Sequence, residues 1–249
     1  MRLSNRTVLV TGGAAGIGRA IAARCAANGA HVCLADIDES GASVAGELER
    51  ETEGTAEFGH LDVTDADAFE TLVGDVVARH GGIDTLFNNA ASLLKRPFEE
   101  TDPGELEQLY RVNVEGVWNG CQAVVPHMRE AGGGAIVNTT SIRGIRGGVD
   151  ITAYSLTKGA VVNFTRSLAA ELGPDGVRVN AICPGSVAHR MRGADDLSEE
   201  TASRRRTETP LQRMGDPDEM AAAAVFLGSD DASFITGQML PVDGGRTIT

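Results

Sequence analysis

The residues best suited to chemistry are Tyr154 and Lys158, in the segment Y-S-L-T-K. On a helix, a spacing of four positions places both side chains on one face, one turn apart. A tyrosine hydroxyl has an ordinary pKa of ~10, too high for an efficient base at neutral pH, but a neighbouring ammonium favours the phenolate. The pair therefore predicts an acid/base centre that removes the proton of an alcohol.

Tyr-x-x-x-Lys alone is a common surface pattern, so the residues that accompany it decide its interpretation. Ser141 directly follows A-I-V-N-T-T, a segment typical of a buried strand. The carboxyl end of a parallel strand faces the crevice in which such sheets bind ligands. Asn113 lies in a long helical segment, where the alternative is a polar residue that bends or caps the helix. Asn113, Ser141, Tyr154 and Lys158 form the predicted catalytic set.

Strand-like and helix-like segments alternate along the chain. The predicted strands lie at residues 7–11, 31–36, 58–63, 84–89, 135–140, 177–183 and 238–242, and the predicted helices at 17–28, 40–53, 66–79, 105–128, 152–172 and 217–227. Such alternation produces a parallel sheet that is covered on both faces. We therefore expect an α/β fold of the doubly wound Rossmann type, with a parallel seven-stranded sheet, as a single domain over residues 1–249.

A glycine-rich turn joins the first predicted strand to the first predicted helix, in T-G-G-A-A-G-I-G. In this context the backbone can approach a pyrophosphate, and the N–H groups at the helix start point at the anion. The alternative is a turn that serves only close packing. The predicted cofactor contacts in this turn are Gly12, Ala15, Gly16, Ile17 and Gly18.

Asp36, at the end of the second predicted strand, indicates which dinucleotide binds. A carboxylate there accepts hydrogen bonds from the adenosine ribose hydroxyls and repels the 2′-phosphate of NADP. The nearby Ala14, Ala15 and Ile37 carry no positive charge, and Arg19 is expected to face solvent. The sequence therefore predicts NAD as the cofactor.

The pattern T-G-x-x-x-G-x-G, the segment N-N-A-A and the Tyr-x-x-x-Lys pair together resemble the classical short-chain dehydrogenase/reductase family, and the resemblance covers nearly the whole chain. It implies that Ser141 holds the substrate oxygen, that Lys158 also binds the nicotinamide ribose, and that Asn113 holds a water linking Lys158 to solvent. The further cofactor contacts that it implies are Ile37, Asp62, Val63, Asn89, Ala90, Ala91, Pro184, Gly185, Val187 and His189, besides Asp36, Tyr154 and Lys158.

Two of these residues depart from the family pattern. His189 stands where P-G-x-V-x-T has threonine, and Ala91 stands where N-N-A-G has glycine. An imidazole can also hydrogen-bond the nicotinamide carboxamide, and the alternative is that His189 turns to solvent. For Asp62 taken alone, the alternative is a turn or helix-capping residue.

The segment at residues 188–210 interrupts the alternation, because it is rich in charge and poor in apolar periodicity. Such long segments in compact domains are commonly functional or disordered, and we expect a substrate lid. The arginine run at 204–206 is interpreted as a solvated helix face. Arg143 and Arg146, just after Ser141, could pair with a substrate carboxylate or phosphate or could face solvent. Trp118 is expected in the core or at a subunit interface.

Composition excludes several classes of protein. The formal charge of −13 argues against nucleic acid and anionic membranes as partners. The four cysteines lack metal-binding spacing, so we expect reduced thiols, no metal and a cytoplasmic protein. The expected partner is a small-molecule alcohol or carbonyl substrate, and the resemblance implies a homotetramer or a homodimer.

The favoured function is hydride transfer between NAD(H) and a secondary alcohol or ketone. A 3-oxoacyl thioester reductase is the nearest alternative, although Asp36 opposes the NADP that such enzymes usually prefer. A non-catalytic nucleotide-binding sensor is the alternative from another class, and the intact set Ser141, Tyr154 and Lys158 argues against it.

Overall fold

A single parallel sheet organises the computed structural model, which describes residues 3–188 and 198–248. Within these residues seven strands are hydrogen-bonded in the order β3-β2-β1-β4-β5-β6-β7. They are β1 (Thr7–Thr11), β2 (His31–Asp36), β3 (Thr55–His60), β4 (Thr85–Asn88), β5 (Gly134–Thr139), β6 (Val177–Pro184) and β7 (Met239–Val242). The order reverses between β1 and β4, so the loops that follow these strands diverge and leave a crevice at the carboxyl edge.

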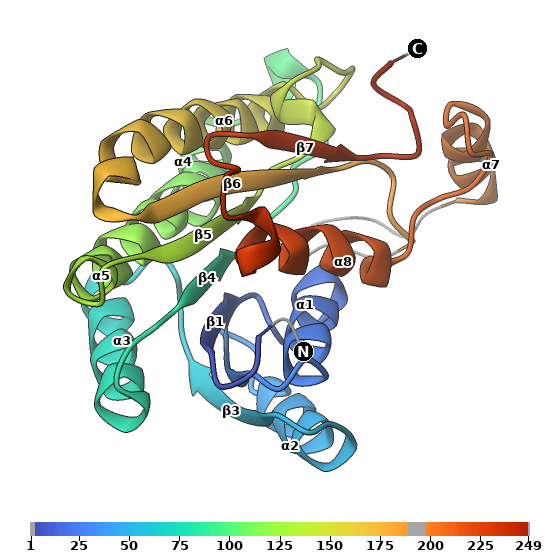
Figure 1. The fold of residues 1–249 in the computed structure, drawn as a ribbon. Helices are drawn as coiled ribbons and strands as arrows, with labels where there is room; N and C mark the ends of the chain where they lie inside the picture. Colours follow the sequence, from blue (N-terminus) through green and yellow to red (C-terminus); the bar gives the residue numbers. More distant parts are fainter. Residues whose placement is uncertain (1–2, 189–197, 249) are drawn as a thin grey trace.

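Helices cover both faces of the sheet (Figure 1). The described helices are α1 (Gly16–Ala26), α2 (Gly41–Glu51), α3 (Ala66–His80), α4 (Pro103–Tyr110), α5 (Gly116–Glu130), α6 (Thr152–Leu172), α7 (Glu199–Thr207) and α8 (Pro217–Gly228). Helices α1, α2 and α8 pack on one face, and α3, α5 and α6 pack on the other. Side chains alternate along β1, since Val8 and Val10 join the first core and Leu9 joins the second. The predicted doubly wound fold is confirmed.

Three predicted elements differ from the structure. The third strand runs from Thr55 to His60 and not over 58–63, because its polar first half pairs with β2 at a half-exposed edge of the sheet. The single helix predicted at 105–128 is three segments: α4, a π-helical turn at Arg111–Glu115, and α5. The region 198–210, predicted to be irregular, contains α7.

Helix α7 escaped prediction because only Ala202 in it is buried, so it has no apolar stripe. Its other signals are local. The N–H of Thr201 donates to the hydroxyl of Ser198, and acidic residues in the first turn and basic residues in the last suit the helix dipole.

Further expectations have mixed outcomes. All four cysteines are free and buried, as predicted. Trp118 is half exposed and lies against Phe164 with ring centroids 5.7 Å apart, so it lies outside the core, and its place at a subunit interface stays a prediction. Among the described residues, no helix is long and apolar enough to cross a membrane, and no group of three or more His, Cys, Asp or Glu side chains is arranged to hold a metal ion.

Candidate active site

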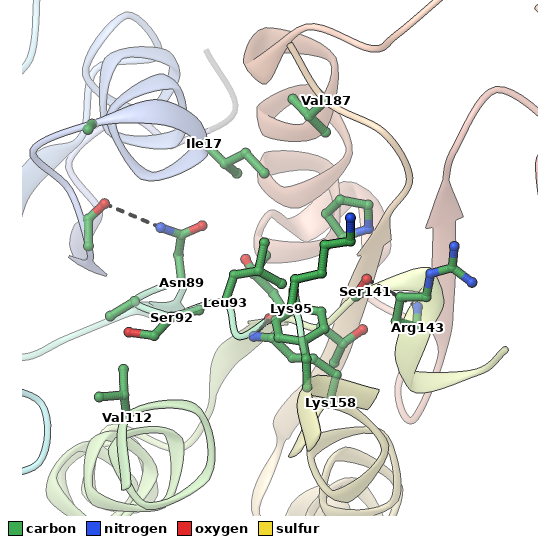
Figure 2. Close-up of a pocket in the computed structure, with 18 of the residues that line it drawn as sticks. Ile17, Asn89, Ser92, Leu93, Lys95, Val112, Ser141, Arg143, Lys158 and Val187 are labelled. Carbon is green, nitrogen blue, oxygen red and sulfur yellow. Dashed lines mark hydrogen bonds between the residues drawn. The ribbon is translucent and has the colours of Figure 1, made fainter. Parts of the chain in front are cut away.

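A cavity of about 1750 Å³ opens along the carboxyl ends of the strands. Figure 2 shows Ile17 and Asn89 on one side of it and Ser141 and Arg143 on the other. The predicted site residues that line it are Gly12, Ala15, Ile17, Asp36, Ile37, Asp62, Val63, Asn89, Ala90, Ala91, Ser141, Tyr154, Lys158, Pro184, Gly185 and Val187. The fold thus brings most of the predicted residues into one cavity.

The glycine turn leaves the start of α1 open to this cavity. Ala15 occupies the N-cap position and cannot cap the helix with its side chain, and the first turn has no acidic residue. Gly12 and Gly16 have φ angles of +66° and +53°, which favour glycine. A Cβ at Gly18 would lie 2.0 Å from the carbonyl oxygen of Gly12, so Gly18 permits close packing of the helix on the turn.

The turn therefore fits the pyrophosphate of a dinucleotide. Uncapped backbone N–H groups and the positive end of the helix dipole favour an anion. Ala15 and Ile17 line the cavity, whereas Gly16 and Gly18 do not and instead shape the backbone. Asn89 holds the turn in place by donating to the carbonyl oxygens of Thr11 and Gly12 at 3.2 and 3.3 Å.

Asp36 lies at the end of β2, beside the glycine turn. Its carboxylate accepts the N–H groups of Ala14 and Asp38, both at 3.0 Å, and these two bonds fix its orientation. Arg19 pairs with Glu47 at 2.8 Å with its side chain half exposed, as expected for a solvent-facing residue. No arginine or lysine thus comes from α1 to neutralise Asp36.

Asp62 lies just beyond the end of β3, where it is bonded as a turn residue and also faces the cavity. Its carboxylate accepts the N–H and the hydroxyl of Thr64, each at 2.9 Å, which is the bonding of a turn residue. It also lines the cavity, together with Val63. Asp36, Asp38, Glu39 and Asp62 give this part of the cavity four carboxylates, and we call it the acidic end.

Ser141 and Tyr154 form the centre of the cavity. The hydroxyl oxygen of Ser141 accepts the N–H of Arg143 at 3.1 Å, so its own hydrogen is directed elsewhere. Burial raises the pKa of Tyr154 to about 12, and a hydrogen bond from Ser141 acts in the opposite direction. Both hydroxyl groups therefore meet at a point where a substrate oxygen could be held between them.

Lys158 lies beneath Tyr154 and is almost completely buried. Its ammonium donates to the carbonyl oxygen of Thr139 at 2.9 Å and lies 5.8 Å from the centre of the Tyr154 ring. Burial lowers the pKa of Lys158 to about 8. The ammonium is thus close enough to favour a Tyr154 phenolate, and it loses its proton at a pH that is far below the usual lysine range.

Asn113 lies in the π-helical turn and is fully buried. Its side-chain amide donates to the carbonyl of Ser92 and the hydroxyl of Thr157, and its oxygen accepts the N–H of Ser92. These bonds occupy both amide hydrogens, so the side chain joins the loop after β4 to α6. Single π turns often occur at functional sites because they interrupt the regular helical hydrogen bonding.

The structure describes only part of the expected lid at residues 188–210. His189 and most of the first half of the expected lid fall in residues 189–197, outside the described residues. In the second half, Arg204 and Arg205 line the cavity, whereas Arg206 pairs with Glu199. Arg204 is mostly exposed, as expected for a solvated helix face, whereas Arg205 is partly buried in the cavity wall.

Sequence reasoning missed Arg246 as a residue of the cavity wall. It follows β7 near the end of the chain, and its guanidinium donates to the hydroxyl of Ser186 at 2.6 Å. No local motif indicates this contact, because β6 and β7 bring the two segments together only in the folded sheet.

Comparisons with known proteins agree with this geometry. A family model described as enoyl-(acyl carrier protein) reductase matches residues 12–247. A meso-2,3-butanediol dehydrogenase from Serratia marcescens is 39% identical, with 100% of this chain and 97% of the relative covered. A 3-oxoacyl-[acyl-carrier-protein] reductase from Chlamydia muridarum is also 39% identical, with 98% of each covered.

A solved structure of another protein has nearly the same fold as this chain. It is a provisionally assigned NAD(P)-dependent gluconate 5-dehydrogenase from Beutenbergia cavernae with NADP bound at low occupancy, and it superposes with a TM-score of 0.94 at 36% identity. The match covers 99% of this chain and 98% of the other. The chain therefore belongs to the classical short-chain dehydrogenase/reductase family, whose members are oxidoreductases with a nicotinamide cofactor.

Proposed function

We propose that this chain interconverts a secondary alcohol and its ketone, with NAD(H) as the hydride carrier. The observation that carries the proposal is the convergence of Ser141, Tyr154 and Lys158 in one cavity with the open start of α1. The relative named for meso-2,3-butanediol supports it, since that compound is a secondary alcohol.

The proposed roles follow from the positions of the side chains. In the direction of oxidation, Tyr154 accepts the hydroxyl proton of the alcohol. A nicotinamide held in the cavity would supply the hydride acceptor. Ser141 donates a hydrogen bond to the substrate oxygen and stabilises the charge that develops there. Lys158 as an ammonium favours the Tyr154 phenolate. Asn113 positions this group by joining the Ser92 loop to α6.

NAD is the proposed cofactor because of the acidic end. The carboxylate of Asp36 is fixed by two backbone N–H groups and has no cation from α1 beside it. It suits ribose hydroxyls as hydrogen-bond donors and opposes a 2′-phosphate. Titration of NADH and NADPH by fluorescence tests this, and equal affinity for both would contradict it.

The reaction is tested with a panel of secondary alcohols, diols, sugars and 3-hydroxyacyl thioesters, each with NAD and with NADP. We expect NADH formation with at least one secondary alcohol. Tyr154→Phe should lower kcat/KM by about 10²–10⁴, because it removes the general base. Tyr110→Phe is the matched control, since Tyr110 is outside the cavity lining and partly exposed.

The panel also separates the alternatives. Turnover confined to thioesters with NADP would favour a 3-oxoacyl thioester reductase, the activity named for one relative. Tight NADH binding without turnover of any compound would favour a nucleotide sensor. The homotetramer implied by the family resemblance is a separate proposal, and light scattering coupled to size-exclusion chromatography tests it.

A further inference from the structure

Five arginines gather at the end of the cavity opposite Asp36. Arg143, Arg204, Arg205 and Arg246 line the cavity itself. Arg146 joins Arg143 and Arg246 in the wall of an adjoining cavity of about 410 Å³. We call these five residues the basic end.

Segments far apart in the sequence build the basic end. Arg143 and Arg146 follow β5, Arg204 and Arg205 lie on α7, and Arg246 follows β7. Hydrogen bonds hold several of them in place. Arg143 donates to the carbonyl of Gly147, Arg146 donates to the carbonyl of Arg246 at 2.8 Å, and Arg246 donates to Ser186.

Within the described part of the chain, one carboxylate pairs with these five arginines. Glu208 is the one glutamate or aspartate that pairs with the basic end among residues 3–188 and 198–248, and it is shared between Arg204 and Arg246. Within the same residues, Arg143 and Arg205 form no ion pair although both are partly buried. Burial and the neighbouring arginines lower the pKa of both side chains, which is the effect of like charges held together.

This excess of cations is unusual in a chain with 35 acidic and 22 basic residues. If the charged residues of this chain were distributed at random over its surface, carboxylates would lie among these five arginines. Guanidinium groups such as those of Arg143 and Arg205, which form no ion pair among the described residues, suit an anion, because a guanidinium can donate two parallel hydrogen bonds to a carboxylate or phosphate.

The phosphates of the cofactor do not explain the basic end. The glycine turn and the open start of α1 fit the pyrophosphate, and a 2′-phosphate would lie beside Asp36 at the acidic end. The basic end instead adjoins the catalytic centre, since Arg143 donates its backbone N–H to Ser141. An anion there would belong to the substrate.

We propose that the basic end binds an anionic group of the substrate, a carboxylate, sulfonate or phosphate, while Ser141 and Tyr154 hold its hydroxyl or carbonyl oxygen. The enzyme then acts on acidic alcohols and ketones in preference to neutral ones. This inference rests on the proposed function for the identity of the reaction, although the anion site itself does not.

The first test is binding without turnover. Sodium sulfate is titrated into the NADH-saturated protein by calorimetry at constant ionic strength, so that the cofactor occupies the glycine turn. Arg205→Gln should weaken sulfate binding roughly tenfold, the usual loss for one charge-assisted hydrogen bond. Arg206→Gln is the matched control, since it removes the same charge from the same helix at a residue paired with Glu199.

The second test compares 3-hydroxycyclohexanecarboxylate with its methyl ester. We expect the wild-type protein to prefer the acid in kcat/KM. Arg205→Gln should reduce that preference roughly tenfold through KM, and Arg206→Gln should leave it intact.

The outcomes separate the two proposals. Sulfate binding that depends on Arg205, without turnover of these two compounds or of any alcohol in the panel, would support the anion site and contradict the proposed function. Turnover of the ester at least as fast as the acid, with sulfate binding indifferent to Arg205, would overturn the anion site and leave the proposed function standing.

Discussion

The two ends of the cavity carry opposite charge and are built in different ways. The acidic end consists of residues at or just after the ends of β2 and β3, and local backbone hydrogen bonds fix Asp36 and Asp62. The basic end collects side chains from three distant segments, after β5, on α7 and after β7. The comparison indicates that the acidic end depends on local backbone geometry, whereas the basic end depends on how remote segments meet.

The centre between the two ends should depend on hydrogen bonding more than on charge. Ser141→Ala should lower kcat/KM for the best substrate by about 10²–10³, because one donor to the developing charge is lost. The matched control is Ser155→Ala. The hydroxyl of Ser155 is buried next to Tyr154 without a hydrogen-bond partner among the described residues. Steady-state kinetics of both variants check this, and similar losses in both would contradict the assignment of Ser141.

Lys158 is the buried cation between the two ends, and its ionisation should affect stability. Its folded-state pKa of about 8 lies below the ordinary value of 10.5, so the unfolded chain binds more protons between these pH values. The contribution of Lys158 to stability should therefore rise with pH across this window, by at most about 3 kcal/mol. Burial raises the pKa of the four cysteines, which lowers stability above pH 9, so the contribution of Lys158 is measured by urea unfolding of the cofactor-free wild type against a Lys158 variant from pH 7 to pH 10.

Lys158→Met is the control for that experiment, because it removes the titrating group and leaves all others. The unfolding free energy of the wild type minus that of the variant should become more positive from pH 8 upward. Tyr154, with its pKa raised to about 12, lowers stability only above pH 10 and so lies outside the measured range. A pH-independent difference would show that Lys158 titrates normally.

The acidic end is tested by Asp36→Ser. The variant should bind NADPH tenfold to a hundredfold more tightly relative to NADH, because a like charge no longer faces the 2′-phosphate. Glu47→Gln removes one charge from the Arg19 pair outside the cavity lining and should leave the ratio unchanged. Fluorescence titration gives both ratios, and the same ratio in wild type and Asp36→Ser would remove the basis for proposing NAD.

The smallest expected effect is a change in sulfate affinity at the basic end. Glu208→Gln removes the carboxylate shared by Arg204 and Arg246, and sulfate affinity should increase a few-fold, since this partly exposed charge is screened by solvent. Glu200→Gln, at the start of the same helix, is the control. Calorimetric titration measures both, and weaker sulfate binding in Glu208→Gln would indicate that Glu208 positions the arginines.

Sequence reasoning predicted the acidic end and the centre of the cavity more completely than the basic end. The glycine turn, Asp36 and the Tyr154–Lys158 pair are specified by short spacings, because one turn or one helix face positions each of them. The edge strand β3 was displaced in the prediction because its first half is polar and half exposed. The break in the helix at Asn113 depends on contacts with Ser92 and Thr157, which no local pattern expresses.

Arg205 and Arg246 could not be assigned for a related reason. Their convergence requires α7 and the segment after β7 to return to the same edge of the sheet, and sequence spacing does not encode that distance. A usable signal for α7 was present in Ser198 and in the change from acidic to basic residues along the helix. It predicts the helix but not the direction in which Arg205 points.

The open start of α1 also links the stability of the protein to its surroundings. Alanine at the N-cap leaves the first backbone N–H groups without a side-chain partner, so a dinucleotide bound as proposed would complete this helix. A ligand present at about a hundred times its dissociation constant stabilises the folded state by about 2.7 kcal/mol. The resistance of this protein to unfolding and proteolysis should therefore follow the supply of nicotinamide cofactor, and amide hydrogen exchange at the first turn of α1 would report that supply directly.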